Sequence, residues 1–327
     1  MELRVLGRTG LPVSRMGLGL AALGRPAYIN LGHADDLDGG YSVEAMRARC
    51  ADVLDAAWIA GVRYVDAARS YGLAEDFLSS WLASRPAGLR PTVGSKWGYT
   101  YTGEWQLQAD EHEVKEHSLE KFTEQLARSR QLLGDDLAVY QVHSVTLGSP
   151  VLTNEALLDA LAGLRDRGTA VGLTLSGADQ AATLERALQI RRDGEVLFAT
   201  VQATWNALEP SAGALLSAAH DAGLGVIIKE GVANGRLTPR APDQGVRRVL
   251  DPIADREQVS VDAVALAHVL AQPWVDVALS GAATVEHLHA NMRATEVRLT
   301  PADQVALATL AESPAAYWDR RSDLEWS

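Results

Sequence analysis

The feature that most constrains the fold is a repeated alternation of helical stretches and short apolar runs. Eight runs rich in apolar and β-branched residues follow one another, at residues 14–19, 62–66, 92–96, 137–143, 170–175, 196–202, 225–229 and 275–280. The helical stretches between them end at chain breakers, as at Gly61 and before Pro86. Eight strand–helix units predict an α/β fold in which parallel strands close into a (β/α)8 TIM barrel.

A doubly wound open sheet is the competing architecture, because it also alternates strands and helices. Such a sheet usually carries a glycine-rich dinucleotide fingerprint after its first strand, and "GLGLAALG" does not have that spacing. The barrel is therefore favoured. Ahead of it, two short apolar runs separated by "GRTG" predict an N-terminal β-hairpin. Since no linker or low-complexity tract interrupts the rhythm, we expect a single domain over residues 1–327.

Composition and charge exclude several classes of partner. The chain has 42 acidic and 30 basic side chains, and a net charge of −12 would repel nucleic acid and anionic membrane surfaces. No apolar run approaches the roughly 18 residues of a membrane span. The single cysteine, Cys50, has no intramolecular disulfide partner, and "MELRVLGRTG" does not resemble a secretion leader. We expect a reduced, cytoplasmic protein that binds neither nucleic acid nor membrane, and the sequence leaves its oligomeric state open.

Four polar side chains stand at adjacent predicted strand ends. Asp66 ends the second strand, Tyr71 follows it in "YVDAARSYG", Lys96 ends the third strand and His143 ends the fourth. In a barrel, the carboxyl ends of the strands form the face that carries active sites. A lysine beside a phenol should stabilise the phenolate and lower the tyrosine pKa, while an aspartate holds the lysine in place. Such a phenol donates a proton to a carbonyl oxygen that the histidine orients, so the pattern indicates carbonyl chemistry without a metal.

Longer loops follow the first, third and seventh predicted strands, at residues 24–41, 98–113 and 231–252. Rings in the first two are expected to wall a substrate pocket, because aromatic side chains supply rigid apolar surfaces. These candidates are Tyr28, Trp97, Tyr99, Tyr101 and Trp105. The cluster "DEHEVKEHS" offers His112 and His117 beside carboxylates, but their spacing does not suit one helical face. We expect a solvated loop there and no metal site.

Over nearly its whole length the chain resembles the aldo-keto reductase family. "LGRTGLPVSRMGLG" is similar to that family's N-terminal hairpin and first strand, and "VDAARSYG" to its aspartate–tyrosine motif, with Ala67 where threonine is usual. "SKWG" and "QVHS" match its lysine and histidine segments. The resemblance implies that Tyr71 is the general acid in reduction and the base in oxidation. It further implies that Lys96 and Asp66 tune Tyr71, and that His143 positions the carbonyl.

The resemblance also implies a nicotinamide cofactor. NADPH is expected because the family commonly uses it, and NADH is the alternative. The resemblance further implies which residues surround the cofactor. Thr174 stands where serine is common, Leu175 where asparagine is common, and Lys229 where an aromatic ring stacks on nicotinamide. His287 stands where arginine or glutamine often meets the 2′-phosphate. The implied cofactor-binding residues are Gly19, Thr174, Gln202, Trp205, Lys229, Glu230, Val232, Asn234, Gly281, Ala283, His287 and Asn291.

Two hypotheses describe Lys229. Its charge disfavours the cationic oxidised nicotinamide relative to the neutral reduced form, or it pairs with Glu230 or another acid and points away from the ring. For the protein as a whole, we expect NAD(P)H-dependent reduction of an aldehyde, ketone or sugar carbonyl. The alternatives are an aldose or alcohol dehydrogenase that runs in the oxidising direction, and a non-catalytic nicotinamide-sensing regulatory subunit.

Overall fold

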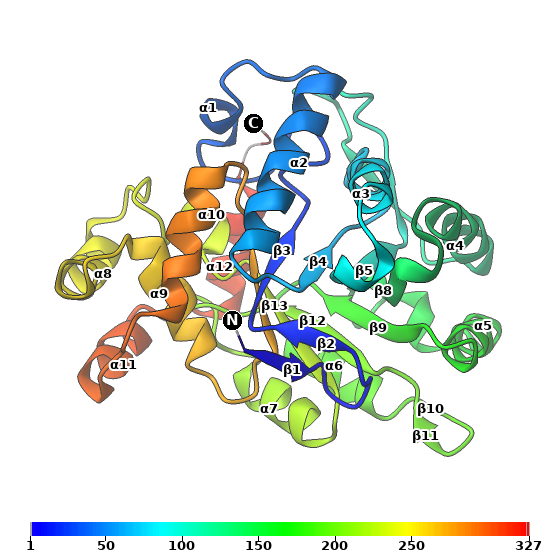
Figure 1. Cartoon of the computed structure of the whole chain (residues 1–327). Helices are drawn as coiled ribbons and strands as arrows, with labels where there is room; N and C mark the ends of the chain where they lie inside the picture. Colours follow the sequence, from blue (N-terminus) through cyan, green and yellow to red (C-terminus); the bar gives the residue numbers. More distant parts are fainter. Residues whose placement is uncertain (1, 325, 327) are drawn as a thin grey trace.

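Eight parallel strands form a closed barrel in the computed structural model, which describes residues 2–324 and 326 (Figure 1). Around the barrel each strand pairs with its neighbour in the chain, and the last pairs with the first. The strands are β3 (Met16–Gly19), β4 (Tyr64–Asp66), β5 (Thr92–Trp97), β8 (Leu137–Val145), β9 (Ala170–Leu175), β12 (Thr200–Thr204), β13 (Gly225–Lys229) and β14 (Val277–Ser280). The predicted (β/α)8 barrel is confirmed.

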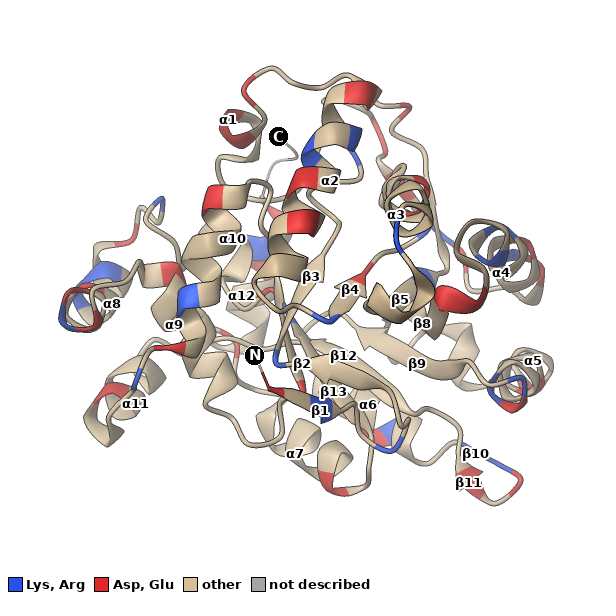
Figure 2. Cartoon of the chain, in the orientation of Figure 1, with Lys and Arg blue, Asp and Glu red and all other residues tan. Residues whose placement is uncertain are grey.

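Helices that follow the barrel strands in the chain pack on the outside of the barrel (Figure 1). They are α2 (Val43–Ile59), α3 (Ala74–Ala83), α4 (Leu119–Leu133), α5 (Glu155–Asp166), α6 (Gln180–Leu188), α7 (Gly213–Asp221), α9 (Val261–Leu270) and α10 (Val285–Met292). In α4 the apolar stripe of Phe122, Leu126 and Leu133 is buried, as amphipathic periodicity requires. The Ser118 hydroxyl caps that helix by accepting the Lys121 backbone N–H. Lys, Arg, Asp and Glu residues occur along several of these helices, for example α2 and α4 (Figure 2).

The N-terminal hairpin closes the amino end of the barrel. Strands β1 (Leu3–Val5) and β2 (Pro12–Ser14) pair antiparallel, and Leu6 and Val13 join a buried cluster with the barrel residue Ile227. Gly7, at φ 48°, is required there, because a Cβ at this position would lie 2.2 Å from the Gly225 nitrogen. The predicted hairpin is therefore present and acts as a plug for the amino end of the barrel.

The sixth barrel strand begins later than the sequence predicts. Residues 191–192 (β10, Arg191–Arg192) and 195–196 (β11, Glu195–Val196) form a small hairpin instead. Asp193 and Gly194 both have positive φ, which suits the tight turn that pairs the flanking residues. The barrel strand consequently starts at Thr200, and the expected run at 196–202 is wrong at its first residues.

The long loops after the strands contain structure of their own. The first contains α1 (His33–Leu37), and the second begins with β6 (Tyr99–Tyr101), which pairs with β7 (Glu113–Lys115). The expected loop at 231–252 is largely helical at its end, where α8 (Gln244–Glu257) begins behind an Asp243 side chain that accepts the Gly245 N–H. Short 3-10 turns occupy Ala87–Leu89, Gly134–Asp136, Pro150–Leu152, Ala233–Gly235 and Arg293–Thr295.

Two further helices complete the chain, α11 (Pro301–Ala308) and α12 (Pro314–Ser322). Tyr317 of α12 is buried, and its hydroxyl accepts the Asn206 side-chain N–H at 3.1 Å, which ties α12 to the loop after β12. Beyond α12, the Trp326 ring lies against the guanidinium of Arg25, which belongs to the loop after β3. Among the described residues, no helix has the length and apolarity needed to cross a membrane.

Candidate active site

The four side chains singled out at the strand ends meet in one place. Lys96 Nζ lies 3.3 Å from the Tyr71 hydroxyl and 2.9 Å from the Ala67 carbonyl oxygen, and it forms a buried ion pair with Asp66. The His143 ring packs edge-to-face on the Tyr71 ring, with 5.6 Å between centroids. Neighbouring barrel strands thus deliver an acid, an ammonium and an imidazole around one phenol.

A tight turn after β4 brings Tyr71 back over its own strand end. The Tyr71 N–H donates to the Ala68 carbonyl at 3.1 Å, and Gly72 follows at φ 56°. A Cβ on Gly72 would lie 2.4 Å from the Gly24 carbonyl oxygen, so glycine is required at this point of close approach. The glycine-ended turn therefore fixes the position of the tyrosine.

Asp66 is held by donors besides Lys96. The Gln202 side-chain N–H donates to Asp66 Oδ1 at 3.0 Å, and the Tyr64 hydroxyl lies 3.4 Å from the same oxygen. These contacts satisfy a carboxylate that is almost fully buried. The resemblance implies that Gln202 binds the nicotinamide carboxamide. Gln202 lines the cavity, and its side-chain amide donates a hydrogen bond to Asp66.

Tyr71 has a raised pKa, contrary to the expectation from sequence. Burial raises it well above 10, the Asp66 and Glu113 charges raise it further, and Arg25 opposes them. The expected lowering by Lys96 is outweighed because the same ammonium is already neutralised by Asp66. Tyr71 is therefore a neutral phenol at physiological pH, which makes it a proton donor.

His143 is a neutral imidazole. Burial lowers its pKa well below 6.5, and the nearby Lys96 and Lys229 charges lower it further. Its ring also packs edge-to-face on Tyr99, with centroids 5.0 Å apart, and Ser70 Oγ lies 3.4 Å from Nδ1. The Tyr71 and Tyr99 rings and the Ser70 hydroxyl hold the imidazole in place, and a neutral imidazole carries a proton on one ring nitrogen and a lone pair on the other.

A cavity of about 530 Å³ opens over this group of residues. Asp66, Tyr71 and His143 form part of its wall. Most residues that the resemblance places at the cofactor line the same cavity, namely Gly19, Gln202, Lys229, Glu230, Val232, Asn234, Gly281, His287 and Asn291. Of the expected substrate residues, Tyr28 and Tyr99 line it.

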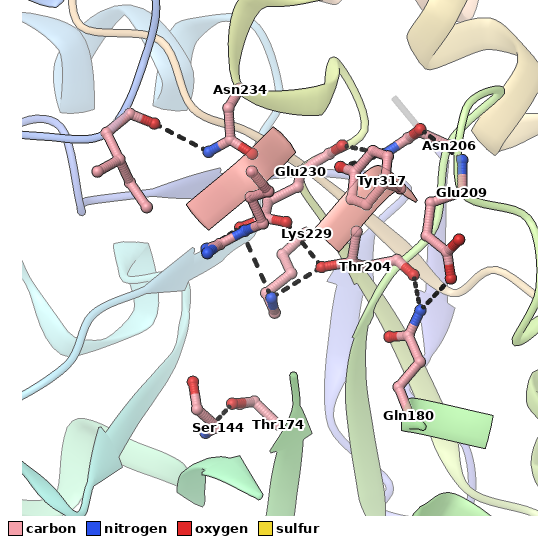
Figure 3. Close-up of polar contacts among 12 residues, drawn as sticks. Ser144, Thr174, Gln180, Thr204, Asn206, Glu209, Lys229, Glu230, Asn234 and Tyr317 are labelled. Carbon is pink, nitrogen blue, oxygen red and sulfur yellow. Dashed lines mark hydrogen bonds and ion pairs between the residues drawn. The ribbon is translucent and has the colours of Figure 1, made fainter. Parts of the chain in front are cut away.

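Three implied cofactor residues do not line the cavity. The Thr174 hydroxyl accepts the Ser144 backbone N–H at 2.7 Å, and Figure 3 draws that pair apart from the contacts of Lys229. Trp205 stacks on His268 with centroids 5.1 Å apart, and its indole N–H donates to the Pro210 carbonyl. Ala283 is buried and is likewise absent from the cavity wall. Local backbone and packing contacts satisfy the two larger side chains.

Three of the expected substrate aromatics, Trp97, Tyr101 and Trp105, are not among the residues that line this cavity. Trp97 follows Lys96 in β5, so its side chain points to the opposite side of the sheet, and it packs on Phe122 of α4 at 5.0 Å. Trp105 packs on Phe77 at 6.2 Å. The Tyr101 hydroxyl accepts the Trp105 backbone N–H at 3.0 Å. Sequence proximity to the third strand did not distinguish these rings from Tyr99.

Lys229 lies near an acid, as one hypothesis expects, and it also lines the cavity, as the other requires. Its Nζ donates to Thr204 Oγ1 at 2.8 Å and lies 3.7 Å from Glu230 Oε1, yet its side chain still lines the cavity (Figure 3). Burial, partly offset by the Glu230 charge, lowers the pKa of Lys229 to about 8. Glu230 also accepts two hydrogen bonds from Arg321, at 2.9 and 2.6 Å. Despite its burial, the Arg321 and Lys229 charges hold the pKa of Glu230 at about 2.

Sequence reasoning missed a second buried ion pair at the cavity. Arg25 donates to Glu113 at 2.6 Å, and its guanidinium lies 5.5 Å from the Tyr71 ring centroid and 4.7 Å from that of Trp326. Glu113 belongs to the cluster expected to be a solvated loop. That expectation is wrong, since His112 is also buried and stacks on Trp326. No local pattern marks these residues, because their partners are far away in the chain.

The cavity has room for a nucleotide-sized ligand, with a volume of about 530 Å³. Ser260 and Asp262 are among its lining residues, although Ser260 Oγ and Asp262 Oδ1 are themselves enclosed and have no hydrogen-bond partner within the part of the chain that the structure describes. A Cβ built on Gly281 meets no atom within 4 Å, which leaves room beside β14. Within residues 2–324 and 326, no group of three or more metal-ligating side chains gathers.

Comparisons with known proteins agree with this geometry. The model of the Aldo/keto reductase family matches residues 15–312. The chain is 26% identical to the aldo-keto reductase str7 of Strobilurus tenacellus, over 95% of this chain and 92% of that protein. It is 27% identical to the NADH-specific methylglyoxal reductase of Escherichia coli, over 94% of this chain and 98% of that protein.

Among solved structures, the aldo-keto reductase AKR11C1 from Bacillus halodurans, in its holo form, superposes with a TM-score of 0.70. That match has 21% sequence identity and covers 96% of this chain and 97% of the other, so it shows the shared fold. The family model spans most of the barrel and both sequence relatives match nearly end to end. The chain therefore belongs to the aldo/keto reductase family, whose members are oxidoreductases that bind a nicotinamide cofactor.

Proposed function

We propose that the protein reduces the carbonyl group of an aldehyde, ketone or sugar, with a nicotinamide dinucleotide as reductant. The observation that carries this proposal is the Lys96 ammonium, which contacts the Tyr71 hydroxyl at 3.3 Å and is paired with Asp66 behind it. Tyr71 and His143 both face the cavity, where a small carbonyl compound would lie between them.

The bound cofactor supplies a hydride to the carbonyl carbon. Tyr71 donates its proton to the carbonyl oxygen, so the product is an alcohol and the enzyme is left with a phenolate. Lys96 stabilises this phenolate at the moment it forms, because its ammonium lies 3.3 Å from the phenol oxygen. Asp66 keeps the ammonium in place, and solvent later returns a proton to Tyr71.

His143 acts as a positioning donor in this proposal. Its depressed pKa keeps the imidazole neutral, so one ring N–H donates a hydrogen bond to the carbonyl oxygen without competing for the Tyr71 proton. Tyr28 and Tyr99 supply aromatic walls for the substrate, together with Trp326 from the C-terminal segment. These walls suit a small carbonyl compound with an apolar or sugar-like face.

Lys229 is proposed to bias binding toward reduced cofactor. Its ammonium lines the cavity and disfavours the positive charge of oxidised nicotinamide. The sequence-based preference for NADPH rests only on the cofactor that the family commonly uses, and a relative 27% identical to this chain is described as NADH-specific.

A cytoplasmic location is proposed from the single cysteine, Cys50, which is buried and unpaired.

Reduction is favoured over oxidation of an alcohol at neutral pH. Oxidation needs Tyr71 as a base, and its raised pKa leaves little phenolate at pH 7. A non-catalytic, nicotinamide-sensing role is the second candidate, because Leu175 and Lys229 stand where the family commonly has the asparagine and the aromatic ring that hold the nicotinamide.

Turnover separates these two candidates. We expect wild-type protein to oxidise reduced cofactor with at least one member of a panel of aldehydes, ketones and aldoses. Tyr71→Phe should lower kcat roughly 10²- to 10⁴-fold, the usual contribution of a positioned acid. Tyr41→Phe is the matched control, because it removes a phenol hydroxyl that binds Ala34 outside the cavity. Undiminished activity in Tyr71→Phe would contradict the proton-donor assignment. Cofactor binding without turnover of any carbonyl would favour the sensing role.

A further inference from the structure

One side of the cavity is formed by α1, α10 and the loop after β13. The carboxylate of Asp36 lies on this side. Asp36 of α1 lines the cavity with its side chain only 3% exposed. It pairs with Arg240, and His287 Nε2 lies 3.7 Å from its Oδ1. Figure 2 shows α1 as an acidic helix beside α10.

The same contacts occupy the arginine that could otherwise receive an anion. Besides its ion pair with Asp36, the Arg240 guanidinium donates to the Gly32 carbonyl at 2.9 Å and to the Leu31 carbonyl at 3.2 Å. Its charge is neutralised and its donors are engaged by α1 and the preceding turn. Release of this guanidinium to a ligand would leave the Asp36 carboxylate buried without its partner, which is costly.

Every other lysine or arginine on the described cavity wall is also paired with an acid. These pairs are Arg25 with Glu113 at 2.6 Å, Arg321 with Glu230 at 2.6 Å and Lys229 with Glu230 at 3.7 Å. Lys229 and Arg321 share the one carboxylate of Glu230, whereas Arg240, the cation beside α1 and α10, has Asp36 to itself.

Unsatisfied acceptors occur on the same wall. Asp262 is only 8% exposed, and its Oδ1 has no hydrogen-bond partner among the described residues. Ser260, the N-cap residue of α9, makes no side-chain capping bond. The carboxylates on this wall are acceptors, and the ribose hydroxyls and the adenine amino group of a dinucleotide are donors. A 2′-phosphate replaces one of these donors with a group that carries about −1.5 to −2 charges.

We infer that Asp36 makes the protein select NADH over NADPH. The carboxylate can accept a hydrogen bond from a free ribose hydroxyl, as acidic residues do in NAD-binding sites of other folds, and it holds Arg240 in an ion pair, so that this cation does not meet a 2′-phosphate. This inference rests on the proposed function, since it requires a nicotinamide dinucleotide in the cavity. It departs from the sequence-based expectation of NADPH.

Cofactor binding to the full-length protein tests this inference without turnover. We would titrate NADH and NADPH and follow quenching of tryptophan fluorescence. The Kd for NADPH should exceed that for NADH by about tenfold, since the 2′-phosphate adds about −1.5 to −2 charges beside a carboxylate and an arginine that are already paired with each other. Asp36→Asn should reduce the ratio by about tenfold, chiefly through tighter NADPH binding, because Arg240 is then released.

Asp35→Asn is the matched control. Asp35 precedes Asp36 on the same helix, is exposed and does not line the cavity, so this variant changes net charge equally and should keep the wild-type ratio. Arg240→Ala leaves the Asp36 charge uncompensated and should raise the ratio. That variant decides the matter if Asp36→Asn does not fold, as judged by circular dichroism.

Each outcome has a definite meaning. Equal or tighter binding of NADPH by wild-type protein overturns the inference but leaves the proposed function intact. Equal weakening of both cofactors in Asp36→Asn also overturns it, because Asp36 then only tethers α1 to Arg240. If neither cofactor binds wild-type protein, the proposed function fails and the inference fails with it.

Discussion

Replacing Lys96 by methionine separates the electrostatic role of the ammonium from its structural role. The Lys96 Nζ to Tyr71 Oη distance is 3.3 Å, and Coulomb's law with an effective dielectric constant of about 20 gives an attraction of about 5 kcal/mol for a full phenolate. Asp66 neutralises part of this attraction, and the phenolate is only partly formed in the transition state. We therefore expect Lys96→Met to lower kcat roughly 10²- to 10³-fold.

The same substitution should destabilise the fold. Asp66 is almost fully buried, and loss of Lys96 leaves it with Gln202 and Tyr64 as its donors. Breaking one side of a buried ion pair typically costs about 3–5 kcal/mol of unfolding free energy. The double variant Asp66→Asn with Lys96→Met removes both charges, so it should regain much of this stability.

Urea denaturation and steady-state kinetics together decide the matter. The double variant should fold more stably than Lys96→Met and remain as inactive, because neither variant has an ammonium beside Tyr71. If Lys96→Met keeps kcat within threefold of wild type, the ammonium does not stabilise a developing phenolate. If the double variant regains activity together with stability, the loss in Lys96→Met was structural and the electrostatic reasoning is refuted.

Three further predictions test other parts of the account. Lys229 has a pKa of about 8, so the preference for reduced over oxidised cofactor should weaken as pH rises through 8 and should be small in Lys229→Tyr. A preference that is independent of pH and of this substitution would exclude a role for its charge. Burial lowers the pKa of His33 and His117 to about 4, so both are neutral in the folded state at pH 6, whereas the unfolded chain binds protons below about 6.5. Unfolding free energy should therefore fall by up to about 3 kcal/mol per histidine between pH 6.5 and 4, and His33→Phe should show a shallower fall in thermal-melt series. The Thr174 hydroxyl accepts the Ser144 N–H, so Thr174→Val should cost about 1 kcal/mol in stability and change cofactor Kd less than threefold. A tenfold loss of affinity in that variant would place Thr174 at the cofactor.

The barrel and the residues around Tyr71 are readable from sequence because they depend on local patterns and on one topological rule. Strand-helix alternation predicts parallel strands, and parallel strands place residues such as Lys96 and His143 at one end of the barrel. Trp97 shows the limit of that reasoning. It lies next to Lys96 in β5, but side chains alternate along a strand, so it packs against α4 while Lys96 reaches Tyr71.

Properties that depend on burial or on distant partners are absent from the sequence pattern. The pKa of Tyr71 is raised because the surrounding chain excludes water, which no spacing of residues reveals. Arg321 meets Glu230 across 91 positions, and Arg240 meets Asp36 across 204. The resemblance to known reductases indicates which residues contact the cofactor. It does not reveal that each cation on the cavity wall has an acidic partner.

A single-turnover experiment shows whether Tyr71 donates a proton during carbonyl reduction. Protein saturated with reduced cofactor is mixed with an excess of a small aldehyde or ketone, and loss of reduced nicotinamide absorbance is followed over time. The account predicts that wild-type protein oxidises one equivalent of bound cofactor, and that Tyr71→Phe binds the cofactor equally well but reacts at least about 100-fold more slowly. Equal rates in the two proteins, or no oxidation with any carbonyl compound despite tight cofactor binding, would contradict it.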